Sequence, residues 1–203
     1  MKNQIVIIHG GHVYDVKDDF LSRLKERKVA REDFKSKTDW KDDLEVKLAS
    51  DFEIFAPRMP NRDNAKYVAW KIWFDKLLPY LEDDLTLVGS SLGGLFLVKY
   101  LSENIFPKMI RSLILVAAPY NGKDSKHDLE TDFSFNDNFK QIEDEVEEVL
   151  LFHSTDDKVV PFSDSQIYRD RLSNAALVSL DNRGHFDIDV FPELIEKIKA
   201  IYS

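Results

Sequence analysis

The sequence predicts an α/β protein built on one mostly parallel, six-stranded sheet with helices on both faces. Short apolar runs alternate along the chain with longer segments of helical periodicity, which is the pattern of strand–helix–strand units. Several of the runs are apolar at consecutive positions, as is typical of strands that are covered on both sides. The 203 residues suffice for one domain with a sizeable core, so we expect a single domain over residues 1–203.

Six apolar runs are the predicted strands, and each is followed by a polar turn or a helical pattern. The strands are expected near residues 5–8, 52–56, 85–89, 112–117, 148–153 and 176–180. The helices are expected near residues 40–49, 64–81, 92–103, 164–173 and 191–202. The run at 85–89 leads directly into the helix at 92–103, where Leu95, Leu97, Val98 and Leu101 recur at helical spacing.

Two insertions interrupt the alternation, at about residues 13–38 and 119–140. The first is highly charged, and Phe20, Leu21 and Leu24 predict one extra amphipathic helix within it. The second is polar and acidic but carries three phenylalanines, which either line an acyl pocket or fill the core: Phe133, Phe135 and Phe139. Both insertions leave from the carboxyl ends of strands, where open α/β sheets bind ligands. They are either surface loops or a small cap over a site.

The most informative motif is Gly89-Ser90-Ser91-Leu92-Gly93, a G-x-S-x-G pattern between a predicted strand and a predicted helix. In this setting the pattern is the nucleophile elbow, whose central serine sits in a strained turn with its hydroxyl exposed. Glycines two residues on either side are required where neighbouring backbones leave no room for a Cβ atom. Only Ser91 is flanked in this way, so we predict Ser91 and not Ser90 as the nucleophile.

A serine nucleophile needs a base that is oriented by a third group. His185 lies in Asn182-Arg183-Gly184-His185-Phe186, just past the last predicted strand, and is the predicted base. The acid should follow the preceding strand, where Asp156 and Asp157 are the two candidates. We favour Asp157, which stands directly before a turn that can aim it across the sheet ends, and expect Asp156 to cap the turn or bond local amides.

The other four histidines have different expected roles. His9 ends the first strand, where we expect its backbone rather than its imidazole to matter. His12 forms an H-x-x-H pair with it, but no third ligand type is nearby, so a metal site is not expected. His127 lies in a polar insertion and should be solvated. His153 falls inside an apolar strand, and we expect a hydrogen-bonded core histidine.

An oxyanion hole would complete the site. The amide of Leu92 follows the nucleophile and opens a helix, whose N-terminus favours negative charge. A second amide is expected from Gly11, in the loop after the first strand.

Composition excludes several other classes of function. The net charge of −9 and the pI near 5.1 argue against a nucleic-acid partner, which would need a basic patch. The absence of cysteine excludes disulfides and thiolate metal sites and favours a reducing compartment. Only four apolar residues precede His9, too few for a signal peptide or a membrane span, so we expect a cytoplasmic protein without a membrane partner.

The chain order Ser91, Asp157, His185 is that of the α/β hydrolases. The chain resembles the small serine hydrolases of the retinoblastoma-binding protein nine type in segments 5–11, 56–61, 88–94, 154–162 and 184–186. The resemblance implies a compact six-stranded hydrolase core without a large lid, no cofactor, and Ser91, Asp157 and His185 as the triad. The namesake's L-x-C-x-E partner motif cannot occur in a chain without cysteine, and the 13–38 insertion is longer than expected.

The leading hypothesis is a serine hydrolase that cleaves small carboxylic esters or thioesters through an acyl-enzyme. Two alternatives remain open: a peptidase or amidase that uses the same triad, and a non-catalytic binding module on a hydrolase fold. An aspartate in place of Ser91 would be expected of a dehalogenase or an epoxide hydrolase. Trp70 and Trp73, on one predicted helix, are expected in the core.

Overall fold

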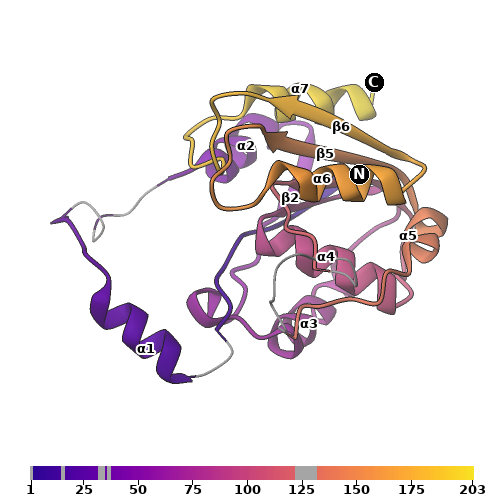
Figure 1. Cartoon of the computed structure of the whole chain (residues 1–203). Helices are drawn as coiled ribbons and strands as arrows, with labels where there is room; N and C mark the ends of the chain where they lie inside the picture. The colour runs from indigo at the N-terminus through magenta and orange to yellow at the C-terminus, as the bar shows by residue number, and fades with distance from the viewer. Residues whose placement is uncertain (1, 15–16, 32–34, 36–37, 122–131) are drawn as a thin grey trace.

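The structure, a computed structural model, describes residues 2–14, 17–31, 35, 38–121 and 132–203 (Figure 1). In this part of the chain, six strands form one sheet in the order β2-β1-β3-β4-β5-β6, and every neighbouring pair is parallel. The strands are β1 (Asn3–Ile8), β2 (Phe52–Phe55), β3 (Leu85–Ser90), β4 (Ile110–Val116), β5 (Val146–Ser154) and β6 (Ala175–Leu180). The predicted fold class is confirmed, with a strand at each of the six predicted places.

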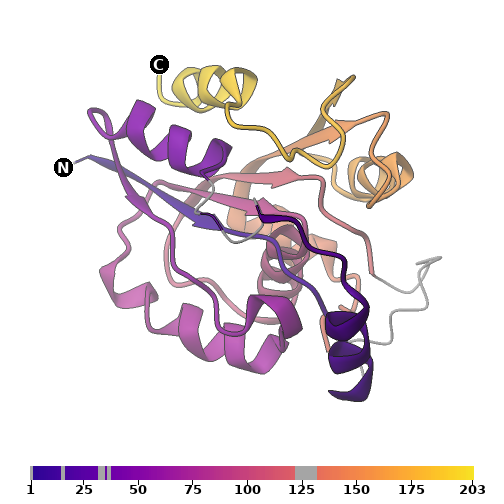
Figure 2. The same ribbon diagram turned by 90° about the vertical axis from the view of Figure 1, so that its left-hand side faces the viewer.

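Helices cover both faces of the sheet (Figures 1 and 2). One face carries α3 (Tyr67–Asp75), α4 (Leu92–Glu103), α5 (Phe139–Glu145) and α6 (Phe162–Arg171), and the other carries α2 (Trp40–Leu48) and α7 (Pro192–Ile201). The single helix predicted over 64–81 is wrong in part: α3 ends at Asp75, and a short 3-10 turn, η3 (Leu78–Tyr80), follows it. Pro79 lacks the N–H that would continue the α-helical hydrogen bonds, which explains the break.

The strands bury side chains on both faces, which explains their continuous apolar runs. On β4, Leu113 and Leu115 pack in the cluster beneath α3 and α4, whereas Ile114 and Val116 pack in the cluster beneath α2 and α7. Consecutive strand residues point to opposite faces, so both layers of the core draw on the same strands.

The order of the strands places the candidate site. The chain goes from β1 to β2 on one side and then to β3 on the other side, so the direction of winding reverses between β1 and β3. Ligands of open α/β sheets bind at such a reversal, beyond the carboxyl ends of the strands. Ile8 of β1 lies opposite Gly89 of β3, which brings the loop after β1 beside the turn that contains Ser91.

The two insertions differ in how they meet the core. The first contains α1 (Lys17–Glu26), the predicted extra helix, which stands away from the sheet in Figure 1 with Leu21 and Leu24 exposed. In the second, residues 122–131 lie outside the described residues. Its three phenylalanines are buried in the core cluster, which favours core filling over pocket lining: Phe133, Phe135 and Phe139. No described helix is both long and apolar enough to cross a membrane.

Candidate active site

Ser91 occupies a strained turn between β3 and α4. Its backbone has φ 52° and ψ −122°, a conformation that residues other than glycine rarely adopt. The turn is held by hydrogen bonds on both sides: the Ser91 N–H donates to the Val116 carbonyl (2.8 Å), and the Ser91 carbonyl accepts from the Gly94 N–H (2.9 Å). These contacts hold the side chain at the carboxyl end of the sheet, as the elbow motif predicts.

The glycines around Ser91 are required by close backbone approach. A Cβ atom on Gly93 would lie 2.2 Å from the Ile8 carbonyl oxygen, and one on Gly89 would lie 2.5 Å from the Gly94 Cα. Neither neighbour is a flexible side chain, so α4 can pack this closely against β1 and β3 only with glycine at these positions. The expected steric role of the two flanking glycines is confirmed.

The structure brings Ser91, His185 and Asp157 together in one chain of hydrogen bonds. His185 Nδ1 lies 2.8 Å from Asp157 Oδ2, and His185 Nε2 lies 3.0 Å from Ser91 Oγ. A carboxylate only accepts hydrogen bonds, so Nδ1 carries the proton and Nε2 is free to accept from the serine hydroxyl. The Asp157 side chain is fully buried, whereas that of His185 is 16% exposed.

The two neighbouring aspartates have different surroundings. Asp157 Oδ1 accepts from the N–H groups of Val159 (2.8 Å) and Val160 (3.0 Å), which leaves Oδ2 for His185. Asp156 has other partners: its Oδ1 accepts from the Ser154 hydroxyl and from the Gly184 N–H (3.2 Å). These bonds lower the pKa of Asp156, chiefly through the Ser154 hydroxyl. Asp156 thus has a local bonding role, as expected, but its local partner is a hydroxyl and the amide that it accepts from lies 28 residues along the chain.

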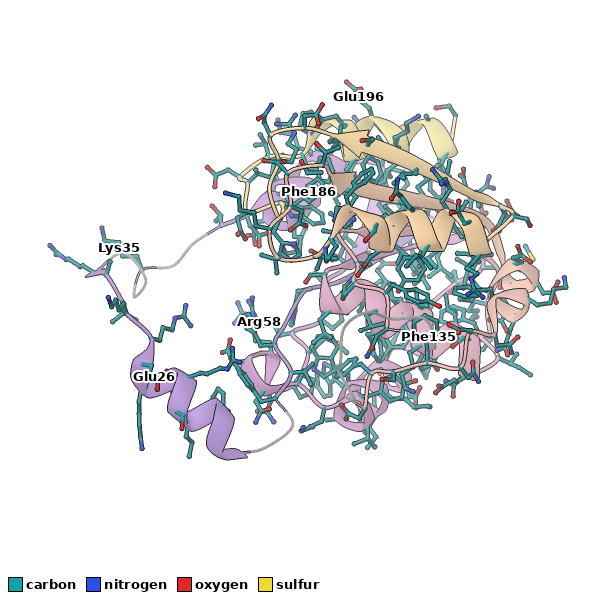
Figure 3. The ribbon with its side chains drawn as sticks, in the orientation of Figure 1. Glu26, Lys35, Arg58, Phe135, Phe186 and Glu196 are labelled. Atoms are coloured by element: carbon teal, nitrogen blue, oxygen red, sulfur yellow. The ribbon has the colours of Figure 1, made fainter. Side chains whose placement is uncertain are left out.

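The loop that carries Asp157 is tied to the loop that carries His185. The Arg183 N–H donates to Ser154 Oγ (3.1 Å), and the Thr155 hydroxyl donates to Asp181. Phe186 is buried against Phe191 with ring centroids 5.0 Å apart, beneath the layer of α2 and α7 (Figure 3). Side-chain bonds on one side of His185 and an aromatic anchor on the other therefore fix its loop.

Gly11 and Leu92, the predicted oxyanion donors, lie side by side. A Cβ atom on Gly11 would come within 3.2 Å of the Leu92 side chain, and one on Gly10 would come within 3.1 Å of Ser91 Cβ. Leu92 is the first residue of α4, so its N–H has no acceptor within the helix. The donor roles of the two amides stay a prediction, which the packing of these loops supports.

The expectation for His9 is wrong in part, because its imidazole does make structural contacts. Nε2 accepts from the Met59 N–H (2.9 Å), and Nδ1 lies 2.7 Å from the Gly10 carbonyl oxygen, to which it donates. Burial lowers the pKa of His9 and favours the neutral ring that this pattern requires. His9 thus ties the glycine loop to the segment after β2. Sequence reasoning missed it because its partner is 50 residues away.

The remaining predicted residues are placed as follows. His153 is fully buried and hydrogen-bonded, as expected, and His127 lies outside the described residues. Within the described residues, no group of three or more potential ligands could hold a metal ion. Trp70 is in the core, where its ring packs edge-on against Phe96 of α4, but Trp73 is 45% exposed, which corrects its predicted burial.

Comparison with known proteins shows the family of the chain. The chain matches the Serine hydrolase family over residues 34–199. Serine hydrolase RBBP9 of Rattus norvegicus is 27% identical over 159 residues, which cover 75% of this chain and 79% of the rat protein.

Solved structures support the same fold. The ydeN gene product of B. subtilis superposes with a TM-score of 0.72 over 99% of both chains at 18% identity. The bromoperoxidase of Bacillus anthracis superposes with a TM-score of 0.65, covering 100% of this chain and 92% of its own, at 15% identity. With an α/β-hydrolase fold and a family match over most of its length, the chain belongs to the Serine hydrolase family.

Proposed function

We propose that the protein cleaves small carboxylic esters or thioesters through an acyl-enzyme, with Ser91 as nucleophile, His185 as general base and Asp157 as its acid partner. The observation that carries the proposal is the hydrogen-bond chain from Asp157 Oδ2 through both nitrogens of His185 to Ser91 Oγ. A hydroxyl alone is a weak nucleophile at neutral pH, and this arrangement supplies both a base and the group that orients it.

In the acylation half-reaction, Ser91 Oγ attacks the carbonyl carbon of the ester and gives its proton to His185 Nε2. The tetrahedral oxyanion accepts hydrogen bonds from the amides of Gly11 and Leu92, each worth on the order of 3 kcal/mol in such sites. Collapse of the intermediate breaks the bond to the leaving alcohol or thiol, which takes the proton from His185. The acyl group is then bound to Ser91 Oγ.

Deacylation repeats these steps with water. His185 takes a proton from the water as it attacks the acyl carbon, and it returns the proton to Ser91 Oγ when the acid leaves. Asp157 stays ionised and stabilises the imidazolium in both half-reactions.

Replacing Ser91 tests the proposal directly. Ser91→Ala should lower kcat for p-nitrophenyl acetate by about 10⁴-fold or more and abolish labelling by a fluorophosphonate probe. Ser90→Ala is the matched control. Ser90 is the last residue of β3, next in sequence to Ser91 but without the flanking glycines, and should keep at least part of the activity. Equal losses in both variants, with unchanged circular dichroism, would contradict the assignment.

The same probe separates the enzyme from a binding module, because an idle site would not label in the wild-type protein. A p-nitrophenyl ester series from acetyl to decanoyl, run beside matched p-nitroanilides, then ranks acyl length and ester against amide. We expect short esters to be the better substrates, since neither insertion has the length of a large lid.

A further inference from the structure

A second imidazole lies behind the acid of the proposed triad. His153, near the end of β5, has its Nε2 atom 3.4 Å from Asp157 Oδ2, the same oxygen that accepts from His185. The side chains of His153 and Asp157 are both fully buried. The carboxylate therefore lies between two histidines, one at the surface of the site and one in the core.

The hydrogen-bond partners of His153 fix its tautomer. Its Nε2 lies 3.0 Å from the Val160 carbonyl oxygen, which can only accept, so Nε2 carries a proton. Burial lowers the pKa of His153 and keeps the ring neutral, although Asp157 and Asp164 act in the opposite direction. The unprotonated Nδ1 then accepts from the hydroxyl of Ser165, 2.6 Å away on α6.

Val160 connects this ring to the carboxylate. The Val160 carbonyl accepts from His153, while the Val160 N–H donates to Asp157 Oδ1 at 3.0 Å. The two peptide groups on either side of the Val160 Cα atom are thus both held, and the one that carries the N–H fixes one oxygen of Asp157 while the other oxygen faces His185. Through the backbone of Val160, these hydrogen bonds connect Ser165 on α6 to Ser91 at the head of α4.

We propose that His153, locked by Ser165, is a positioning residue that holds the Asp157 carboxylate in the orientation that His185 needs. The preceding β5 residues, from Val149 to Phe152, are buried and apolar, and a leucine at 153 would continue that pattern. A buried polar ring costs free energy unless it is fully hydrogen-bonded. The His153 ring is bonded to Val160, in the turn that holds Asp157. The inference rests on the proposed function of Asp157.

Three substitutions test it. His153→Leu removes the N–H donor, and kcat for p-nitrophenyl acetate should fall roughly 10–100-fold with KM changed less than about 3-fold, as for other outer partners that orient a functional histidine. His153→Gln can still donate to Val160 and should recover part of the loss. Ser165→Ala keeps the ring and its bond to Val160 but removes the hydroxyl that holds Nδ1, so it should give a smaller loss in kcat. This variant provides a second test if His153→Leu does not fold.

The control is a buried hydroxyl at the opposite end of the sheet. Ser112 is hydrogen-bonded to Thr86 at 2.8 Å, near the start of β4 and β3. Ser112→Ala should lower stability without changing kcat. Active sites in every variant are counted by exhaustive fluorophosphonate labelling, so loss of folded protein does not appear as loss of kcat.

A double-mutant cycle gives the decisive result. If His153 acts through the carboxylate, His153→Leu should cost almost nothing further in an Asp157→Asn background. Two results would overturn the inference. One is that the losses in kcat from His153→Leu and Asp157→Asn multiply in the double variant. The other is a kcat per labelled site within about 3-fold of wild type in both His153→Leu and Ser165→Ala. Failure of the proposed function is distinguishable, because Ser91→Ala would then keep its activity.

Discussion

At the residue scale, Asp157 and Asp156 show how one position in sequence separates two roles. Asp157 Oδ2 is directed at His185, and its other oxygen is held by two backbone amides. Asp156 instead joins the Ser154 hydroxyl to the Gly184 amide, using one oxygen for both bonds. The proposed mechanism needs the charge of the first residue and only an acceptor oxygen from the second.

Asparagine substitutions at the two positions should therefore differ greatly. Asp157→Asn should lower kcat by about 10⁴-fold, as the equivalent change does in a serine protease triad, since the amide favours the wrong tautomer of the histidine. Asp156→Asn keeps an acceptor for Ser154 and Gly184 and should cost less than about 10-fold. Steady-state kinetics on p-nitrophenyl acetate checks both values. A severe loss in Asp156→Asn beside a nearly normal Asp157→Asn would move the acid one residue upstream.

Sequence reasoning reached Ser91, Asp157 and His185 because each lies in a local pattern: symmetric glycines, a turn after a strand, or a glycine-containing loop before the last helix. The bonds of His9, by contrast, join it to Met59, 50 residues away, and those of His153 join it to Ser165 on a different element. Nothing local to either histidine marks such partners. Contacts of this kind follow from the folded arrangement alone.

At the scale of elements, the turn from β3 to α4 depends on how closely the helix approaches the sheet. The strand, the turn and the helix were predictable because an apolar run, a G-x-S-x-G motif and a helical period follow one another without a gap. The helix α5 was not, because its seven residues lie beside an acidic insertion and are too few for a clear period. Its buried Phe139 and Ile142 take their place from packing.

Gly93→Ala should destabilise the protein by about 3 kcal/mol or more, because its methyl group would meet the Ile8 backbone and overpacking against backbone cannot be relieved by a rotamer change. Gly184→Ala is the matched control. Gly184 has φ +52° but open space around it, so alanine there should cost only about 1–2 kcal/mol of backbone strain. Urea unfolding measures both, and equal costs would contradict the steric argument.

At the scale of the whole molecule, the buried His153 and the half-buried His9 link stability to pH. Burial lowers the pKa of His9 and of His153 below the value of about 6.5 that they have in the unfolded chain. Below that pH the unfolded chain binds more protons than the native one, so the free energy of unfolding must fall as the pH is lowered. Above about pH 7 the two histidines do not lower the free energy of unfolding, because neither state binds the extra protons. From about pH 6.5 down toward the folded-state pKa values, the free energy of unfolding declines.

His153→Gln should therefore flatten the dependence of stability on pH between about 5.5 and 7. The slope contributed by each histidine is at most about 1.4 kcal/mol per pH unit. Urea unfolding at pH 7.5, 6.5 and 5.5 measures it, with His9→Gln as the parallel variant. An unchanged slope in both variants would mean that neither ring resists protonation in the native state.

The spread of the proposed triad along the chain has a consequence for biosynthesis. Ser91 and His185 are 94 residues apart, and His185 follows β6, the last strand of the sheet. A nascent chain exposes its elbow serine long before the base has been translated, and parallel pairing of distant strands is a slow step in folding. On the proposed mechanism, the growing polypeptide should be inert toward esters until the final strand docks, and recovery of probe labelling during refolding should time that last event.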